Sequence, residues 1–322
     1  MNVNRRTVTL LIVAIAVIGG VYAITWWQRD RETGRLLTEM QSTDHRIASE
    51  AITPLADRVP SVRASLIGLM QHDDSDVRWR SALILGEARD SLSRDALMVA
   101  LSDEVPTVRA QAALALGKRN VRAAADRIAL MAASDEEELE VRTAAVQALR
   151  MLRTSTHLLE VVEIAGDRPP PPPEEDDEDA EEYVDETALL RQEAVYAVAA
   201  LYARSPAANG DLVPADNAIS VLVASTDPST EPNADVRRAA CYALGDLAGN
   251  VREEEIHRSA VGALLSAMND EVGDVRIAAG HTLQLVPVPA NMRQSVNRAM
   301  EAAANDDHYW VRRAAERAVG GG

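Results

Sequence analysis

The sequence predicts an all-α protein in which helical hairpins stack one on the next, preceded by one transmembrane helix. Three observations support this prediction. A motif that reads DVRRAACYALG at Asp235–Gly245 recurs along the chain. Phe is absent and aromatic residues make up 3% of the chain, which favours a thin core of closely packed, Ala-rich helices. Residues 7–28 carry no charge, which is typical of a membrane anchor.

The recurring motif has the periodicity of one buried helix stripe. Counted from its first Arg, position −1 is Val or Leu, position +3 is Ala or Ser, and position +7 is Leu or Val. These positions share one face of an α-helix, and repetition at this length is typical of stacked helical hairpins. The copies, each expected as the second helix (B) of a hairpin, are Val77–Gly86, Val108–Gly117, Val141–Arg150, Leu190–Ala199, Asp235–Gly245, Val275–Gln284 and Val311–Gly320.

A first helix (A) is expected before each copy. The predicted A helices are Ser61–Met70, Ser93–Leu101, Ala123–Ala133, Thr156–Ala165, Ala215–Ala224, Glu255–Met268 and Ala290–Ala303. Two insertions interrupt the series. Residues 205–213 and 225–234 are rich in turn-forming Pro, Asn, Asp and Ser, and a Pro/acidic insertion covers 167–186. Five prolines followed by a run of like charges predict a disordered, solvated loop there. A docking segment for a basic partner and a divalent-cation site are the alternatives.

The N-terminal 58 residues are expected to lie outside the helical array. After a short tail (1–6), the uncharged segment 7–28 spans about 33 Å as a helix, enough to cross a bilayer. Trp26 and Trp27 occupy the position of an interfacial pair. This predicts a single-pass membrane protein whose array lies outside the cytoplasm, with the lipid bilayer as a partner. The alternative is a signal peptide cleaved after Ala23, which would leave an exported soluble protein. Residues 29–58 are expected to form a helical or partly ordered stalk, with a plain spacer as the alternative.

The D-V-R-x-x-A-x-x-A-L-G pattern resembles HEAT repeats, specifically the phycobilisome-lyase HEAT-like subfamily. The resemblance covers Ser61–Gly320 and implies a right-handed α-solenoid of about seven hairpins over residues 59–320, with the B helices on its concave side. The copy at Leu190–Ala199 departs most from the pattern, because it has Leu in place of Val and lacks the closing Gly.

The charged residues of the motif predict a structural ladder. An Arg near a helix N-terminus opposes the helix dipole, so it is expected to pair with carboxylates of its own and adjacent turns. The Asp two residues earlier is expected to accept N–H groups at the helix start. The ladder residues are Asp76, Arg78, Arg109, Arg142, Asp235, Arg237, Asp274, Arg276 and Arg312. The Gly at position +8 fits a helix end or close packing, and the single Cys, Cys241, is expected in the core.

No enzyme or cofactor chemistry is predicted. Two related HEAT-like families are enzymes, but the His-Glu pairs of the iron-bearing hydroxylase type are absent from this sequence, and nothing points to a bilin pigment. No two histidines have metal-ligand spacing, and no phosphate-binding or nucleophile motif occurs. We therefore expect no catalytic residue, cofactor or metal. Nucleic acid is not expected as a partner, because the chain outside the acidic run 174–186 is still mildly acidic and no basic stripe is present.

The function that the sequence favours is a tethered scaffold that binds a protein or peptide along the array. Positions +1 and +5 of each B helix point away from the buried stripe. These positions hold aromatic and cationic side chains of the kind that dominate binding hot spots. The candidate partner-binding residues are Trp79, Tyr196, Arg238, Tyr242 and His281. An enzyme of the lyase or hydroxylase type and a passive spacer in an envelope assembly are the alternatives.

Overall fold

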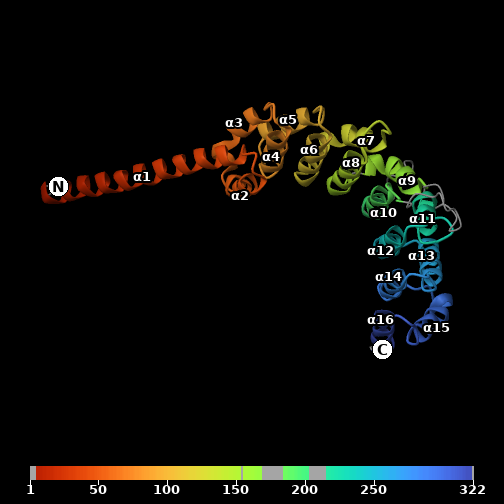
Figure 1. Ribbon diagram of the computed structural model, residues 1–322. Coiled ribbons are helices and arrows are strands. Elements are labelled where there is room, and N and C mark those ends of the chain that lie inside the picture. The colour runs from red at the N-terminus through yellow and green to blue at the C-terminus, as the bar shows by residue number, and fades with distance from the viewer. Residues whose placement is uncertain (1–4, 154, 169–183, 203–214, 321–322) are drawn as a thin grey trace. The chain divides into compact units, whose positions relative to one another are not determined.

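The computed structural model describes the backbone of residues 5–153, 155–168, 184–202 and 215–320, and their side chains except those of 5–14, 215–216, 314 and 316–320. The chain divides into two compact units, Met1–Ala100 and Leu101–Gly322. All the regular structure of the described residues is helical (Figure 1). The Pro/acidic insertion at 169–183 and the insertion at 205–213 lie outside the described residues.

The N-terminal unit contains five α-helices in its described part. They are α1 (Arg5–Met40), α2 (His45–Ala56), α3 (Val59–Leu69), α4 (Ser75–Leu85) and α5 (Ser91–Ala100). Helix α2 packs on α1 and on α4, and α3 packs on α4. Helix α2 begins where the Asp44 side chain accepts hydrogen bonds from two backbone N–H groups. Helix α4 begins at Asp74, whose side chain accepts one hydrogen bond, from the Asp76 N–H.

Residues 29–58 fold into this unit. Leu36 and Met40 at the end of α1 are buried, as are Ala51 and Leu55 of α2. The buried Arg80 of α4 donates a hydrogen bond to the Met40 carbonyl at 3.1 Å. The segment expected as a stalk therefore adds a layer of helices to α3 and α4.

The prediction of a transmembrane helix over residues 7–28 is wrong, and the lipid bilayer is not supported as a partner. Within the described part of the chain, no helix combines the length and the apolar character that crossing a membrane requires. Helix α1 continues through charged residues to Met40.

The C-terminal unit is a two-layer stack of helices. One layer holds α7 (Ala125–Ala133), α9 (Leu158–Gly166), α11 (Ala215–Ala224), α13 (Glu254–Ala267) and α15 (Arg293–Ala303). The other holds α6 (Pro106–Lys118), α8 (Leu139–Leu152), α10 (Ala188–Tyr202), α12 (Ala234–Asn250), α14 (Gly273–Leu283) and α16 (Tyr309–Gly320). Each helix of a layer packs on the next in the same layer. The second layer, made of the B helices, follows the inner side of the curve that this unit makes (Figure 1).

The repeated motif forms the core between the layers. At position +3 the small residues Ala112, Ala145, Ala194, Ala240 and Ala279 are fully buried. Small side chains here let neighbouring helices approach closely. At Gly117 of α6, an added Cβ would lie 2.8 Å from the Cα of Ala148 on α8. Cys241 is fully buried in α12, and burial raises the pKa of its thiol to about 12.

Candidate protein-binding face

The motif arginines lie at the amino-terminal ends of the B helices and bind the turn that precedes each helix. In α12, Nη1 of Arg237 donates to the carbonyl oxygens of Glu231 and Pro232 at 3.1 and 2.7 Å. The same Nη1 contacts, to the carbonyls five and six residues earlier, are made by Arg78, Arg109, Arg276 and Arg312. The guanidinium therefore satisfies backbone carbonyl groups of the turn. The sequence predicts only carboxylates as partners of these arginines.

In Arg109, Arg237 and Arg276 the other nitrogens reach the turn of the following repeat. Nε and Nη2 of Arg237 contact both carboxylate oxygens of Asp270 at 2.7 and 3.0 Å, and both side chains are buried. Arg276 holds Asp306 in the same bidentate way at 2.8 Å for both bonds, and these hydrogen bonds lower the pKa of Asp306 to about 2. Arg109 contacts Glu137 at 2.6 Å. Each of these acids precedes the next motif Arg by five or six residues, a spacing visible in the sequence.

Two arginines of the series differ from this pattern. Arg142 donates to the Ala132 carbonyl at 3.1 Å and pairs with the exposed Asp135 at 2.8 Å. Arg191 belongs to the copy that departs most from the motif, and the predicted ladder omitted it. Its side chain is 1% exposed and contacts Asp185 at 2.6 Å and Glu231 at 2.9 Å. Burial alone would lower the pKa of Arg191, but its hydrogen bonds to the two carboxylates raise it above the ordinary value.

The three aspartates of the predicted ladder lie in the first turns of their helices. Asp76 and Asp235 each follow the residue that caps the helix, Asp74 in α4 and Asn233 in α12. Asp76 pairs with Arg80 at 3.2 Å. Asp235 pairs with Arg238 at 2.9 Å, and Asp274 lies 3.9 Å from the same Arg238. The structure thus places Asp235 and Asp274 beside the candidate binding residue Arg238. The carboxylate partner of Arg237 is Asp270 instead.

Four candidate partner-binding residues lie along consecutive B helices. Tyr196 of α10, Arg238 and Tyr242 of α12, and His281 of α14 form what we call the α10–α14 face. The Tyr242 side chain is 37% exposed, and its ring meets that of His281 edge to face at 6.5 Å between centroids. Burial raises the pKa of Tyr196, and the charge of Arg238 acts on the same hydroxyl. These side chains therefore form one continuous strip.

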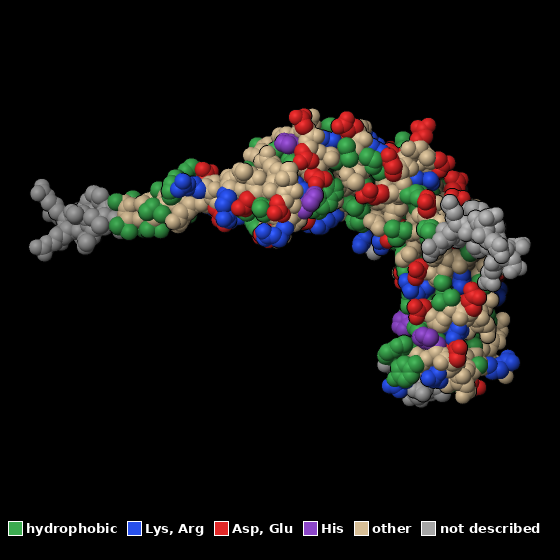
Figure 2. Space-filling model, viewed as in Figure 1, with side chains coloured by type: hydrophobic (Ala, Val, Ile, Leu, Met, Phe, Trp, Pro, Cys, Tyr) green, Lys and Arg blue, Asp and Glu red, His purple; other side chains and the backbone are tan. Residues whose placement is uncertain are grey.

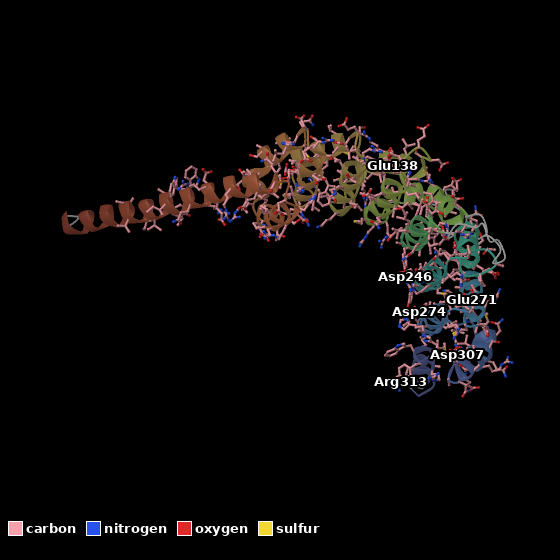
Figure 3. The ribbon with its side chains drawn as sticks, in the orientation of Figure 1. Glu138, Asp246, Glu271, Asp274, Asp307 and Arg313 are labelled. Carbon is pink, nitrogen blue, oxygen red and sulfur yellow. The ribbon has the colours of Figure 1, made fainter. Side chains whose placement is uncertain are left out.

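Charged residues border this strip. Asp246, Asp274 and Arg313 lie along the B-helix side of α12, α14 and α16, whereas Glu271 and Asp307 lie at the turns that lead into B helices (Figure 3). At the end of the unit formed by α16, Tyr309 and Trp310 are exposed and form an edge-to-face pair at 4.9 Å. Hydrophobic side chains gather at this end of the unit (Figure 2). The surface is thus aromatic and mixed in charge.

Trp79, the fifth candidate, is not brought into the α10–α14 face. It lies half-buried in α4 of the N-terminal unit. In the described part of the chain, no group of three or more His, Cys, Asp or Glu side chains could hold a metal ion.

Comparisons with known proteins bear on the fold. A family model described as HEAT repeats matches residues 62–150 and 222–320. No curated protein sequence matches the chain. Among solved structures, the Kap95:Nup1 complex is similar at a TM-score of 0.62 and 15% identity, over 88% of this chain and 38% of that one. YibA of Escherichia coli is similar at 0.55 and 15% identity, over 89% and 92% of the two chains.

A third similar structure is the complex of CpcE and CpcF of phycocyanin lyase from Nostoc. Its TM-score is 0.43 and its identity 21%, over 79% of this chain and 85% of that one. A likeness at this level carries no inference about activity. The comparisons show the repeat fold.

Proposed function

Because the chain belongs to the HEAT-repeat family, we propose that it is a non-catalytic scaffold that binds a protein or peptide partner along the α10–α14 face. The family assignment rests on a match to more than half of the chain. Repeat solenoids present extended surfaces of this kind to their partners.

The observation that carries the proposal is the strip of exposed and half-buried aromatic and cationic side chains on successive B helices. At position +1 of α6 and α8, by contrast, Ala110 and Thr143 are small and buried. Tyr and Arg supply large, amphipathic contact area and are enriched where binding energy concentrates. Their presence from α10 onward marks one part of the B layer for contact with another molecule.

The spacing of the strip suits an extended peptide. Neighbouring packed helices lie about 8–10 Å apart, and an extended chain advances about 3.3 Å per residue. Every third side chain of a bound strand would therefore meet the next B helix. Arg238, flanked by Asp235 and Asp274, would accept a peptide with both signs of charge.

The test compares two triple variants of the full chain in affinity capture followed by mass spectrometry. Tyr196→Ala/Arg238→Ala/Tyr242→Ala removes the strip. Leu130→Ala/Leu159→Ala/Arg258→Ala removes exposed side chains of the other layer and serves as the matched control. We expect specific partners to be lost from the first variant and retained by the second, with melting temperatures close to that of the parent chain.

Two results would overturn the proposal. If the strip variant retains every partner, binding occurs elsewhere, and if no specific partner is captured by the parent chain, a spacer role is favoured. A collapse of the melting temperature in the strip variant alone would show that these side chains are packed within the stack.

A further inference from the structure

A cavity of about 580 Å³ lies at the carboxyl ends of three consecutive B helices, α6, α8 and α10. Its volume falls in the range of about 300–1,000 Å³ that is typical of ligand sites. The motif arginines lie at the opposite, amino-terminal ends of the B helices. The cavity is lined by Gly117, Lys118, Asn120, Arg150, Met151, Arg153 and Ala200.

The lining of this cavity is positive in an acidic protein. Among the described residues, Lys118, Arg150 and Arg153 line it and no carboxylate does, although the chain has a net charge of −17. Cations near the last turns of α6 and α8 complement the helix dipoles. The Nε atom of Arg150 is buried and has no hydrogen-bond partner among the described residues, while its Nη2 donates to Glu193 at 3.1 Å. The Nε donor therefore remains available to a bound acceptor.

The backbone around the cavity adopts the left-handed conformation at two points. Asn120 and Arg153 have φ angles of 54° and 55°, and they are the described non-glycine residues with positive φ. Both line the cavity. The left-handed position after a helix is ordinarily filled by Gly, and Arg153 occupies it after α8 with no ion-pair partner among the described residues. Strain of this kind is concentrated at functional sites.

We propose that this cavity binds an oxyanion, a carboxylate or a phosphate, carried by a protein segment. Arg150 and Arg153 supply the planar N–H donors that match either group in a bidentate geometry. The cavity adjoins the α10–α14 face, because Arg150 contacts Glu193 of α10 and its charge acts on Tyr196. The inference that a protein segment carries the oxyanion rests on the proposed function, whereas the oxyanion site does not depend on it.

The experiment measures probe binding to the full chain. Fluorescein-labelled hexaglutamate is titrated by anisotropy, and inorganic pyrophosphate is titrated as its competitor; the two probes separate carboxylate from phosphate preference. We expect Arg153→Ala and Arg150→Ala each to weaken probe binding about tenfold or more. Arg293→Ala, which removes an exposed Arg of α15 with no ion pair in the described structure, should change it less than about twofold.

Two further variants separate charge from backbone conformation. Arg153→Gly relieves the left-handed strain at this position, so it should raise the melting temperature. It should also weaken probe binding as much as Arg153→Ala does. Arg153→Lys keeps the charge but loses the bidentate geometry, so it should weaken probe binding, though less than Arg153→Ala does. If Arg153→Gly binds the probe like the parent, the proposal is overturned.

The outcomes for the two proposals are distinguishable. Probe binding that depends on Arg153, together with no captured partner, supports the oxyanion site and counts against the scaffold. Partner capture with no measurable probe binding, or with equal losses in Arg153→Ala and Arg293→Ala, refutes the oxyanion site and leaves the scaffold standing.

Discussion

At the scale of single residues, the motif arginine joins two repeats with one side chain. Arg237 donates from Nη1 to its own turn and from Nε and Nη2 to Asp270 of the next turn. Asp270 in turn offers its backbone carbonyl to Arg276 at 2.8 Å. This division of donors requires the planar guanidinium, so Lys is not an equivalent substitute here.

The first prediction concerns the buried pair of Arg237 and Asp270, whose side chains are 1% and 0% exposed. Removing either partner leaves an uncompensated buried charge, so Arg237→Ala and Asp270→Ala should each cost about 3–5 kcal/mol of unfolding free energy. A double-mutant cycle by urea unfolding should give a coupling of about 2 kcal/mol. The half-exposed pair of Arg238 and Asp235 is the control, with about 0.2–1 kcal/mol expected. Equal couplings for the two pairs would contradict this account.

The identity of Arg237's partner shows where sequence inference ends at this scale. The helix dipole predicts that an Arg at a helix start needs acceptors, and the structure supplies them. The choice of Asp270 over Asp235 depends on how two repeats stack, because Asp270 lies 33 residues away in the chain. The carbonyl acceptors depend on the path of the turn, which side-chain chemistry alone does not specify.

At the scale of elements, small residues set the separation of the B helices. Gly117 of α6 lies directly against α8, and Gly245 of α12 lies against Thr282 of α14. Gly262 of α13 has open space around it. Close helix packing therefore requires glycine at positions 117 and 245, but not at position 262.

The second prediction compares two glycine substitutions in helices of the C-terminal unit. Gly117→Ala forces α6 and α8 apart and should destabilise the chain by about 1–3 kcal/mol, the usual cost of overpacking. Gly262→Ala meets no atom within 4 Å and should stabilise it by about 0.5–1 kcal/mol through helix propensity. Thermal unfolding of both variants tests this. A stabilised Gly117→Ala chain would show that α6 and α8 have room to separate.

The helices of the array could be predicted because each copy of the motif encodes its own buried stripe. The predicted A and B helices agree with the structure in order and nearly in bounds; the predicted Ala215–Ala224, for example, is α11. The packing of α1 and α2 escaped prediction, because their buried residues Leu36, Met40 and Leu55 carry no copy of the motif. The cavity at the carboxyl ends escaped it too, because three helices contribute to its lining.

At the scale of the whole molecule, the C-terminal unit is held together by contacts between neighbours. Helix α12 packs on α14, and α14 packs on α16. Arg276 of α14 pairs with Asp306 in the turn before α16. In such stacks, stability is approximately a sum over repeats and their interfaces. The loss of a terminal repeat should therefore be felt mainly by its neighbour.

The third prediction follows from a truncation after Pro287, which removes α15 and α16. Helices α13 and α14 lose their outer neighbours, and Arg276 loses its carboxylate, so amide hydrogen exchange should accelerate there. Exchange in α6 and α8 should stay within a few-fold of the full chain, since their contacts are intact. A uniform acceleration across the unit would contradict a stack of nearest neighbours and indicate a single cooperative block.

The position of Lys118 has a consequence for the reactivity of the molecule. It is the only lysine in the sequence, and its exposed side chain stands at the rim of the cavity between α6 and α8. An acylating reagent selective for primary amines therefore has one side-chain target, apart from the chain's own α-amino group. A photoactivatable tether placed on that amine would report molecules that come within its length of the cavity, so the chain carries its own attachment point for identifying what it binds.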